Sequence, residues 1–90
     1  MTVTYDPAKR AVTLHQRGLD FADADEVFAG RTATRVDDRK DYGELRLITA
    51  GHLHGRFVVL VWTPREDARH IISMRHGHGR EEQDWLDQMG

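Results

Sequence analysis

Residues 57–62 read Phe-Val-Val-Leu-Val-Trp, six apolar side chains in succession. A strand that is apolar on both faces belongs in the middle of a sheet, with other elements covering each side. We therefore predict a central strand over Arg56–Thr63. The rest of the chain must supply its neighbouring strands and the layers that cover them.

Three further strands are predicted at Arg31–Val36, Glu44–His52 and Arg69–Arg75. The last two connections between strands span only residues 53–55 and 64–67, and connections this short join antiparallel neighbours. Residues 37–43 form a longer polar turn region. We expect a four-stranded antiparallel sheet, to which Thr2–Tyr5 adds a possible short strand at the N-terminus.

Side chains alternate between the two faces of a strand, so each predicted strand carries two sets of residues. In residues 44–50, the polar set Glu44 and Arg46 shares a face with Ile48. Strict alternation over residues 69–75 gives Ile71, Ser73 and Arg75 on one face, and His70, Ile72 and Met74 on the other.

Two helices are predicted before the sheet and one after it, which gives a small α+β domain. Asp6-Pro7 supplies a capping carboxylate and a first-turn proline, and Gly18 ends that helix. Asp20 caps a second helix over Phe21–Ala29, and a closing helix begins near Arg80. The faces expected to pack inward are Ala8, Ala11, Val12 and His15 in the first helix, Phe21, Ala24, Val27 and Phe28 in the second, and Trp85, Leu86 and Met89 in the third.

The length and composition indicate one domain over residues 1–90. The chain has no cysteine, which excludes disulfides and thiolate chemistry. No apolar run approaches the roughly 18 residues of a membrane span, and residues 1–10 lack the apolar stretch of a signal peptide. We expect a cytoplasmic protein without a membrane partner.

The net charge of −2 is unevenly distributed along the chain. Residues 29–80 carry ten basic side chains against six acidic ones, whereas residues 20–28 and 81–90 each carry four acidic side chains and no basic one. All but two of the 13 basic residues are arginine, whose planar guanidinium group suits phosphate. The middle of the chain is therefore the part that favours a phosphate-bearing ligand.

Six short pieces of the sequence, in order from about Tyr5 to Glu81, resemble the BrnT family of toxins. These pieces are Tyr5-Asp6-Pro7-Ala8-Lys9, Arg17-Gly18-Leu19-Asp20-Phe21, Glu26-Val27-Phe28, Asp41-Tyr42-Gly43-Glu44-Leu45-Arg46, Gly51, and Ile71-Ile72-Ser73-Met74-Arg75 with Glu81. The resemblance implies a RelE-like ribonuclease fold and membership of a type II toxin–antitoxin system. It also implies that the toxin cleaves RNA without a metal and is neutralised by a ribbon-helix-helix antitoxin, BrnA.

Such cleavage needs a base for the ribose 2′-hydroxyl, cations for the phosphate and an acid for the leaving 5′-oxygen. By the resemblance, Arg46 and Arg75 match arginines of the family motifs and are expected to stabilise the phosphate. Glu44 matches the motif glutamate and is expected either to act as the base or to orient Arg46. Further contacts with the substrate are expected from Lys9, Tyr42 and Ser73.

The sequence departs from the family just before the glycine that ends the first helix. BrnT-like proteins usually carry Lys-His there, whereas this chain has Gln16-Arg17. Arg17 keeps a positive charge but lacks the imidazole that exchanges protons near pH 7. We include Arg17 among the candidate catalytic residues, together with His76, which could restore proton transfer from the end of the last strand.

Five of the six histidines lie in or beside the predicted strands, namely His52, His54, His70, His76 and His78. These positions straddle turns, and no histidine pair has the four-residue helical spacing of a zinc site. We therefore expect neither a metal nor another cofactor.

Two functions remain open on the sequence. One is a metal-independent endoribonuclease toxin; the other is a catalytically impaired, toxin-like binding module that acts with an antitoxin in a DNA-binding repressor complex. Both imply an antitoxin partner, and both are compatible with a homodimer or with a heterotetramer that includes the antitoxin.

Overall fold

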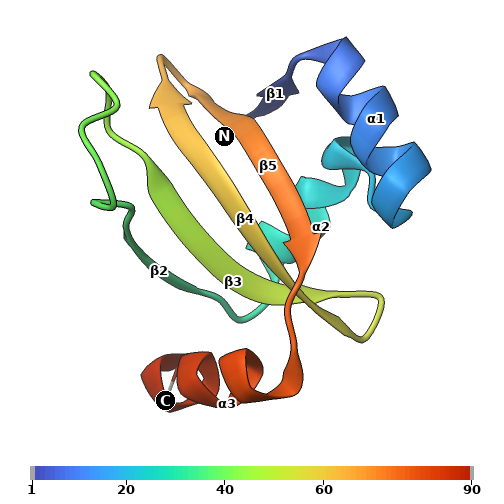
Figure 1. Ribbon diagram of the computed structural model, residues 1–90, viewed down its shortest axis with the longest axis vertical. Coiled ribbons are helices and arrows are strands. Elements are labelled where there is room, and N and C mark those ends of the chain that lie inside the picture. The colour runs from blue at the N-terminus through green and yellow to red at the C-terminus, as the bar shows by residue number, and fades with distance from the viewer. Residues whose placement is uncertain (1, 90) are drawn as a thin grey trace.

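The computed structural model describes residues 2–89, and it places a five-stranded sheet between helices (Figure 1). In chain order the elements are β1 (Thr2–Tyr5), α1 (Pro7–Arg17), the 3₁₀ turn η1 (Phe21–Asp23), α2 (Ala24–Ala29), β2 (Ala33–Val36), β3 (Leu47–Leu53), β4 (Arg56–Arg65), β5 (Ala68–His76) and α3 (Gly79–Met89). The strands lie in the order β1-β5-β4-β3-β2. The α+β class is therefore confirmed.

The sheet is mixed, so the prediction of a purely antiparallel sheet is wrong in one respect. β2, β3, β4 and β5 are antiparallel neighbours, but β1 pairs with β5 in parallel, from Thr2 beside Ala68 to Tyr5 beside Ile71. Val3 and Tyr5 of β1 pack against the core, which accounts for the short strand closing the free edge of β5. The N-terminal strand is thus a full member of the sheet.

β4 is the central strand, as its apolar sequence predicts, but only one face is fully covered, since α3 covers the other face only near Phe57 and Val59. Val58 and Leu60 pack toward η1 and α2, while Phe57 and Val59 pack toward α3. The larger cluster comprises Leu19, Phe21, Ala24, Val27, Leu53, Val58, Leu60, Trp62, Ile71 and Met74. The smaller one comprises Ala50, Phe57, Val59 and Trp85.

A β-bulge in β5 overturns the strict alternation predicted for residues 69–75. Val61 of β4 pairs with Ser73, but the next residue, Trp62, pairs with Ile71, so Ile72 has no partner on β4. The extra residue lets Ile71 and Met74 both point into the larger core, although three positions separate them. On the opposite face it brings His70 into line with Ser73, where alternation alone would separate them.

Several element boundaries differ from those predicted, and the differences at β3 and at the second helix change the local structure most. β3 begins at Leu47 rather than at residue 44, because the β2–β3 ladder ends where the Asp37 N–H donates to the Arg46 carbonyl at 2.8 Å. Glu44 therefore lies in a loop and not on a strand. The second helix opens with η1, whose cap is the Asp20 side chain accepting from Ala22 N–H at 2.9 Å.

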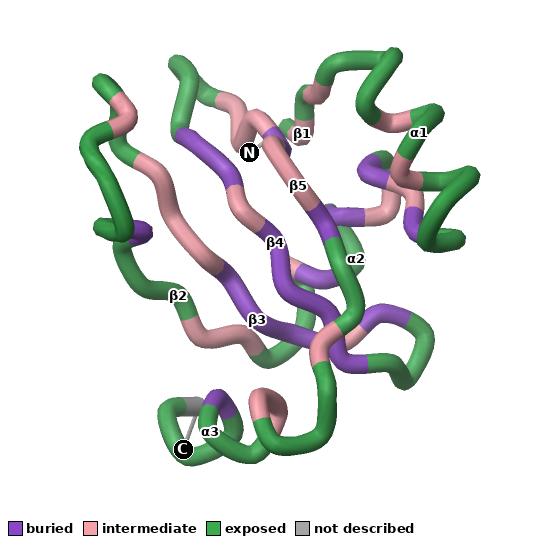
Figure 2. The backbone as a smooth tube through the Cα atoms, in the orientation of Figure 1, coloured by how far each residue is buried: buried purple, intermediate pink, exposed green. Residues whose placement is uncertain are grey.

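The packing predicted for α1 is also wrong, although its predicted ends are confirmed. Asp6 caps the helix, and Gly18 ends it in the left-handed conformation at φ 68°. However, none of its residues is buried, and the expected inward face, Ala8, Ala11, Val12 and His15, is exposed (Figure 2). Polar contacts hold this helix instead: the Arg10 guanidinium group donates to both carboxylate oxygens of Asp20, at 2.7 and 2.9 Å.

α3 lies across one end of the sheet, at the bottom of Figure 1, and is anchored by Trp85. The Trp85 side chain is only 1% exposed, and the Arg35 guanidinium carbon lies 4.1 Å from its ring centroid. Leu86 is exposed, so only part of the predicted apolar stripe is buried. The side chain of Met89, also predicted on that stripe, lies outside the described residues.

The turn between β5 and α3 requires a glycine at position 77. A Cβ atom there would overlap the buried ring of Phe57 and would lie 2.9 Å from Oε1 of Glu81. We predict that Gly77→Ala lowers the free energy of unfolding by roughly 1–3 kcal/mol, the usual cost of overpacking. The measurement is the urea midpoint.

Gly79→Ala is the matched control for this prediction, because a Cβ at residue 79 meets nothing within 4 Å and α3 begins there. It should leave the midpoint unchanged or raise it slightly. Equal effects of the two substitutions would contradict the packing described for Phe57.

Candidate functional site

The face of the sheet opposite α2 is covered by α3 at only one end, and we call this whole face the open face. Its membership follows from the register, because Val59 and Ile48 pack toward Trp85 and their neighbours on the same side share that direction. The polar residues on the open face include Arg46, Thr63, Arg65, His70, Ser73 and Arg75, together with Thr4 at one edge and Arg35 and His52 near α3. Arg46 and Arg75 thus project from the same side of the sheet, Arg46 from the residue just before β3 and Arg75 from β5.

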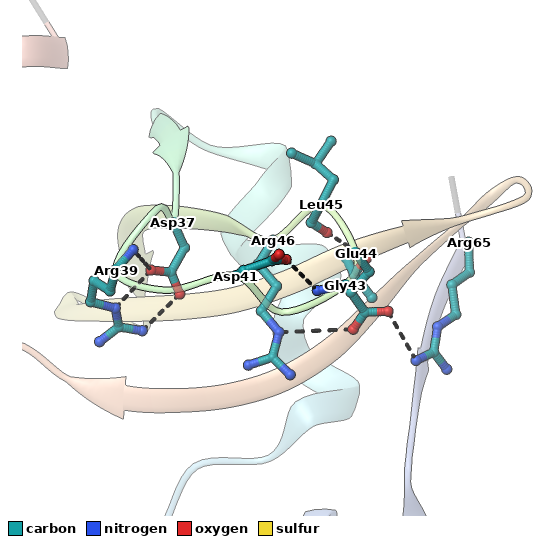
Figure 3. Close-up of polar contacts among 9 residues, drawn as sticks. Asp37, Arg39, Asp41, Gly43, Glu44, Leu45, Arg46 and Arg65 are labelled. Carbon is teal, nitrogen blue, oxygen red and sulfur yellow. Dashed lines mark hydrogen bonds and ion pairs between the residues drawn. The ribbon is translucent and has the colours of Figure 1, made fainter.

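The loop at residues 37–46, between β2 and β3, is shaped by aspartate side chains (Figure 3). The Asp37 carboxylate is fully buried and accepts from Nε and Nη2 of Arg39 at 2.7 and 2.8 Å. These bonds lower the pKa of Asp37 from 3.8 to about 2, because they favour its ionised form more than burial disfavours it. Further along, Asp41 accepts from the N–H of Gly43, whose φ of 71° suits glycine.

The end of this loop brings together Tyr42, Glu44 and Arg46 with Arg65 of β4, and we call these four residues the loop cluster. The Arg46 guanidinium carbon lies 4.0 Å from the centroid of the Tyr42 ring, a cation–π contact. Glu44 lies between two arginines, 3.8 Å from Nε of Arg46 and 3.7 Å from Nη2 of Arg65 (Figure 3). Both distances exceed hydrogen-bond length, so the carboxylate attracts the two cations without being bonded to either.

Nε of Arg46 is buried and has no hydrogen-bond partner among residues 2–89. An unsatisfied buried donor costs about 1–3 kcal/mol, more when it is charged. The Arg46 side chain is 27% exposed, so the rest of the guanidinium group is accessible from outside. An anion can approach the exposed part of this guanidinium group, whereas the buried Nε faces away from solvent.

Arg75 lies on the open face with its charge already paired. Its guanidinium group donates to both carboxylate oxygens of Glu81 in α3, at 2.8 and 2.7 Å. This bond raises the pKa of Arg75 and lowers that of Glu81, while the nearby positive charge of Arg39 slightly opposes the rise at Arg75. A phosphate can reach this arginine only by competing with Glu81.

Arg17 and His76 come together at the far end of β5, apart from the loop cluster. Nη1 of Arg17 donates to the carbonyl of Met74 at 2.9 Å, and Nε2 of His76 lies 3.3 Å from the carbonyl oxygen of Arg17. Lys9 lies elsewhere, beside a shallow apolar hollow on α1 that is lined by Ala8, Lys9, Val12 and Thr13. The predicted site residues therefore form separate groups, of which the loop cluster is the most compact.

Comparison with known proteins assigns the family. Residues 5–81 match the family described as "Ribonuclease toxin, BrnT, of type II toxin-antitoxin system". The chain belongs to the BrnT family. No curated protein matches the sequence.

Membership of the BrnT family confirms the resemblance seen in the sequence and assigns the protein to the ribonuclease toxins of type II toxin–antitoxin systems. A toxin of this type works as one half of a pair, so an antitoxin is its family partner. The match spans the loop cluster, β5 and Glu81. It does not by itself assign a role to any of these residues.

The histidines of this BrnT protein are dispersed. His52 bonds Glu82 of α3 at 2.8 Å, and His54 lies 2.9 Å from Glu26 of α2. Within the described residues, no group of three or more histidine and acidic side chains lies close enough to hold a metal ion. No described helix has the length and hydropathy that crossing a membrane requires.

Two residues were not predicted from the sequence, one a member of the loop cluster and one beside it. Arg65 was assigned to a turn, but β4 extends to it and brings its side chain to Glu44. His70 was placed on the wrong face, because the bulge at Ile72 is not visible in a pattern of apolar residues. The sequence signal that could have found Arg65 was the acidic residue Glu44. Opposite charges on neighbouring strands favour a cross-strand pair, and Arg65 is the basic residue that Glu44 meets.

The buried Asp37 gives a pH-dependent prediction for this loop. Its pKa is lower in the folded protein than the usual 3.8, so its ionised form stabilises the fold fully above pH 3.8, and this contribution is lost as the pH falls toward 2. We predict that Asp37→Asn lowers the free energy of unfolding at pH 7 by about 1–2 kcal/mol. The difference from the unmodified protein should shrink below pH 4.

Asp38→Asn is the control, because Asp38 is the exposed neighbour of Asp37. It removes the same charge and should change stability little at any pH. Urea midpoints at a series of pH values measure both variants. A difference at Asp37 that stays constant from pH 7 to pH 3 would contradict the role given to its ion pair.

Proposed function

We propose that the open face is the RNA-cleaving surface of this toxin and that Arg46 holds the scissile phosphate. The observation that supports this most directly is the partly exposed guanidinium group of Arg46, which lies against Tyr42 and is 3.8 Å from the Glu44 carboxylate, too far for a hydrogen bond. The reaction is attack of a ribose 2′-oxygen on the adjacent phosphorus without a metal. Arg46 stabilises the negative charge that grows on the phosphate oxygens in the transition state.

The neighbours of Arg46 suit this role. Tyr42 stacks on its guanidinium group and restricts its orientation, so little conformational entropy is lost when a phosphate binds. Glu44 balances the positive charges of Arg46 and Arg65 while it leaves their hydrogen-bond donors free. We assign Glu44 to positioning Arg46, which is one of the two roles that the sequence left open for it.

Arg75 is proposed as a second phosphate contact that becomes available when Glu81 is displaced. On β4, Arg75 pairs with Val59, and the β3–β4 register continued by one residue places Arg46 beside Thr63. Val59 and Thr63 are four positions apart on β4. Four residues correspond to about 13 Å along a strand. The two arginines are therefore suited to different phosphates of one RNA strand, and Ser73 lies between these positions.

The partner proposed for the toxin is a ribbon-helix-helix antitoxin of the BrnA type. The acidic side chains within residues 20–28 and 81–90 would attract a lysine- or arginine-rich segment of that partner. Homodimers and heterotetramers are both compatible with such docking. We propose a cytoplasmic location, where RNA and antitoxin are both present.

The hydrogen bonds of the other two candidate arginines, Arg75 and Arg17, favour a second function. The Arg75 guanidinium group donates to the Glu81 carboxylate, and Arg17 donates to the Met74 carbonyl. A protein with these groups engaged and with Arg17 in place of an imidazole could serve as a catalytically impaired module. It would then act with its antitoxin in a DNA-binding repressor complex.

Cleavage of an RNA oligonucleotide by the purified protein in excess chelator tests the proposed function. We predict that Arg46→Ala lowers the rate about 100-fold or more, the usual loss when one transition-state hydrogen-bond donor is removed. Arg80→Ala is the control, because it removes an equal charge from an exposed position in α3. Arg80→Ala should keep the rate within a few-fold of the unmodified protein.

Equal rates for Arg46→Ala and the unmodified protein would contradict the role of Arg46. The double variant Gln16→Lys with Arg17→His restores the family pair and separates the two functions. If the native protein cleaves no RNA and the restored one does, the impaired module is the correct function. Growth arrest on expression of each protein provides the matching observation in cells.

A further inference from the structure

A row of polar side chains crosses the open face next to the loop cluster. Thr63 of β4 pairs with His70 of β5, and His70 pairs with Thr4 of β1. Arg46 lies next to Thr63 on the β3 side, opposite His70. This position follows from two contacts: Leu47 pairs with Trp62, and the Thr63 hydroxyl donates to the carbonyl of Leu45 at 2.6 Å. Two strand spacings, about 10 Å, therefore separate the backbones of Arg46 and His70.

The imidazole of His70 is held by one nitrogen only. Nδ1 lies 2.9 Å from Oγ1 of Thr4, within hydrogen-bond distance. Within residues 2–89, Nε2 has no assigned hydrogen bond, and the residue is only partly buried. When Nδ1–H donates to Thr4, the lone pair of Nε2 is free to accept a proton.

Four charged groups act on His70. Lys9 of α1 and Arg65 of β4 disfavour the imidazolium ion, whereas Glu44 of the loop and Asp6 at the start of α1 favour it. Partial burial is the largest effect, and together these influences lower the pKa of His70 below 6.5. The imidazole is therefore neutral at pH 7, the protonation state that a general base needs.

We propose that His70 is the general base of this toxin and takes the proton of the ribose 2′-hydroxyl through Nε2. The inference rests on the proposed function, in which the scissile phosphate lies at Arg46. As the proton moves to Nε2, the 2′-oxygen forms a bond to phosphorus and the bond from phosphorus to the 5′-oxygen breaks. Water protonates the leaving 5′-oxygen, the products are a 2′,3′-cyclic phosphate and a 5′-hydroxyl, and His70 returns its proton to solvent.

The other candidate bases fit this step less well. Nε2 of His76 faces the carbonyl of Arg17 at the end of β5, so it is placed to donate and is remote from Arg46. Glu44 lies between two guanidinium groups, and removing its charge would leave both without a counterion. Its negative charge instead favours the imidazolium ion that forms at His70 during the reaction.

The test compares single-turnover cleavage of an RNA oligonucleotide by the unmodified full-length protein, His70→Gln and His70→Ala across pH 5–8. Gln can still bond Thr4 but cannot carry the proton, so we expect both variants to lose about 100-fold or more in rate. The acid limb of the pH–rate profile, which should fall below pH 6.5 in the unmodified protein, should disappear. Added imidazole should partly restore His70→Ala, and the affinity for a 2′-O-methyl RNA should change less than about threefold.

His15→Gln is the matched control, because His15 is an exposed histidine on α1 and is not part of the sheet. It should cleave at the unmodified rate. If His70→Gln cleaves normally while Arg46→Ala does not, His70 is not the base and the RNA-cleaving surface stands. If the unmodified protein forms no cyclic phosphate product, both the proposed function and the role of His70 are wrong.

Discussion

The bulge at Ile72 is the constraint on which the polar surface of the sheet depends. β5 must bury Ile71 and Met74 in the same core, although three positions separate them, and only an unpaired residue between them allows this. The same extra residue places His70, Ser73 and Arg75 together on the opposite face. Packing on one side of the sheet thus determines which side chains share the open face on the other.

The charges of this surface are balanced by carboxylates rather than left open. Glu44 lies beside both Arg46 and Arg65. Two acidic residues of α3 make further contacts, since Glu81 binds Arg75 and Glu82 binds His52. Consequently α3 is attached to the sheet by charged contacts as well as by Trp85. A polyanion that competes for Arg75 would also loosen this attachment, which links the binding of a long RNA to the position of α3.

The central strand and the helix ends could be predicted because each rests on a local rule. Six apolar residues in succession require burial on both faces, and Asp6, Gly18 and Asp20 act on their own backbone neighbours. The packing of α1 could not be predicted, because its apolar face is exposed and the helix is held by an ion pair between Arg10 and Asp20.

Tyr42, Glu44 and Arg46 were candidates from motif likeness, and because they are close in sequence the structure places them together in the loop cluster. Motif likeness could not show that Glu81 binds Arg75, or that Arg65 of β4 lies beside Glu44, because each contact joins two separate elements. His70 was missed for a different reason. A bulge changes the face of every residue beyond it, and nothing in the pattern of apolar residues marks its position.

The central claim is that RNA lies on the open face, over Arg46 and His70, and chemical-shift mapping with a 2′-O-methyl RNA tests it most directly. This RNA lacks the attacking hydroxyl and cannot be cleaved, so the bound state persists during the measurement. We predict the largest shifts at Nε of Arg46, the ring of Tyr42 and the imidazole of His70. Shifts confined to the hollow on α1, around Ala8 and Val12, with Arg46 unchanged, would contradict the account.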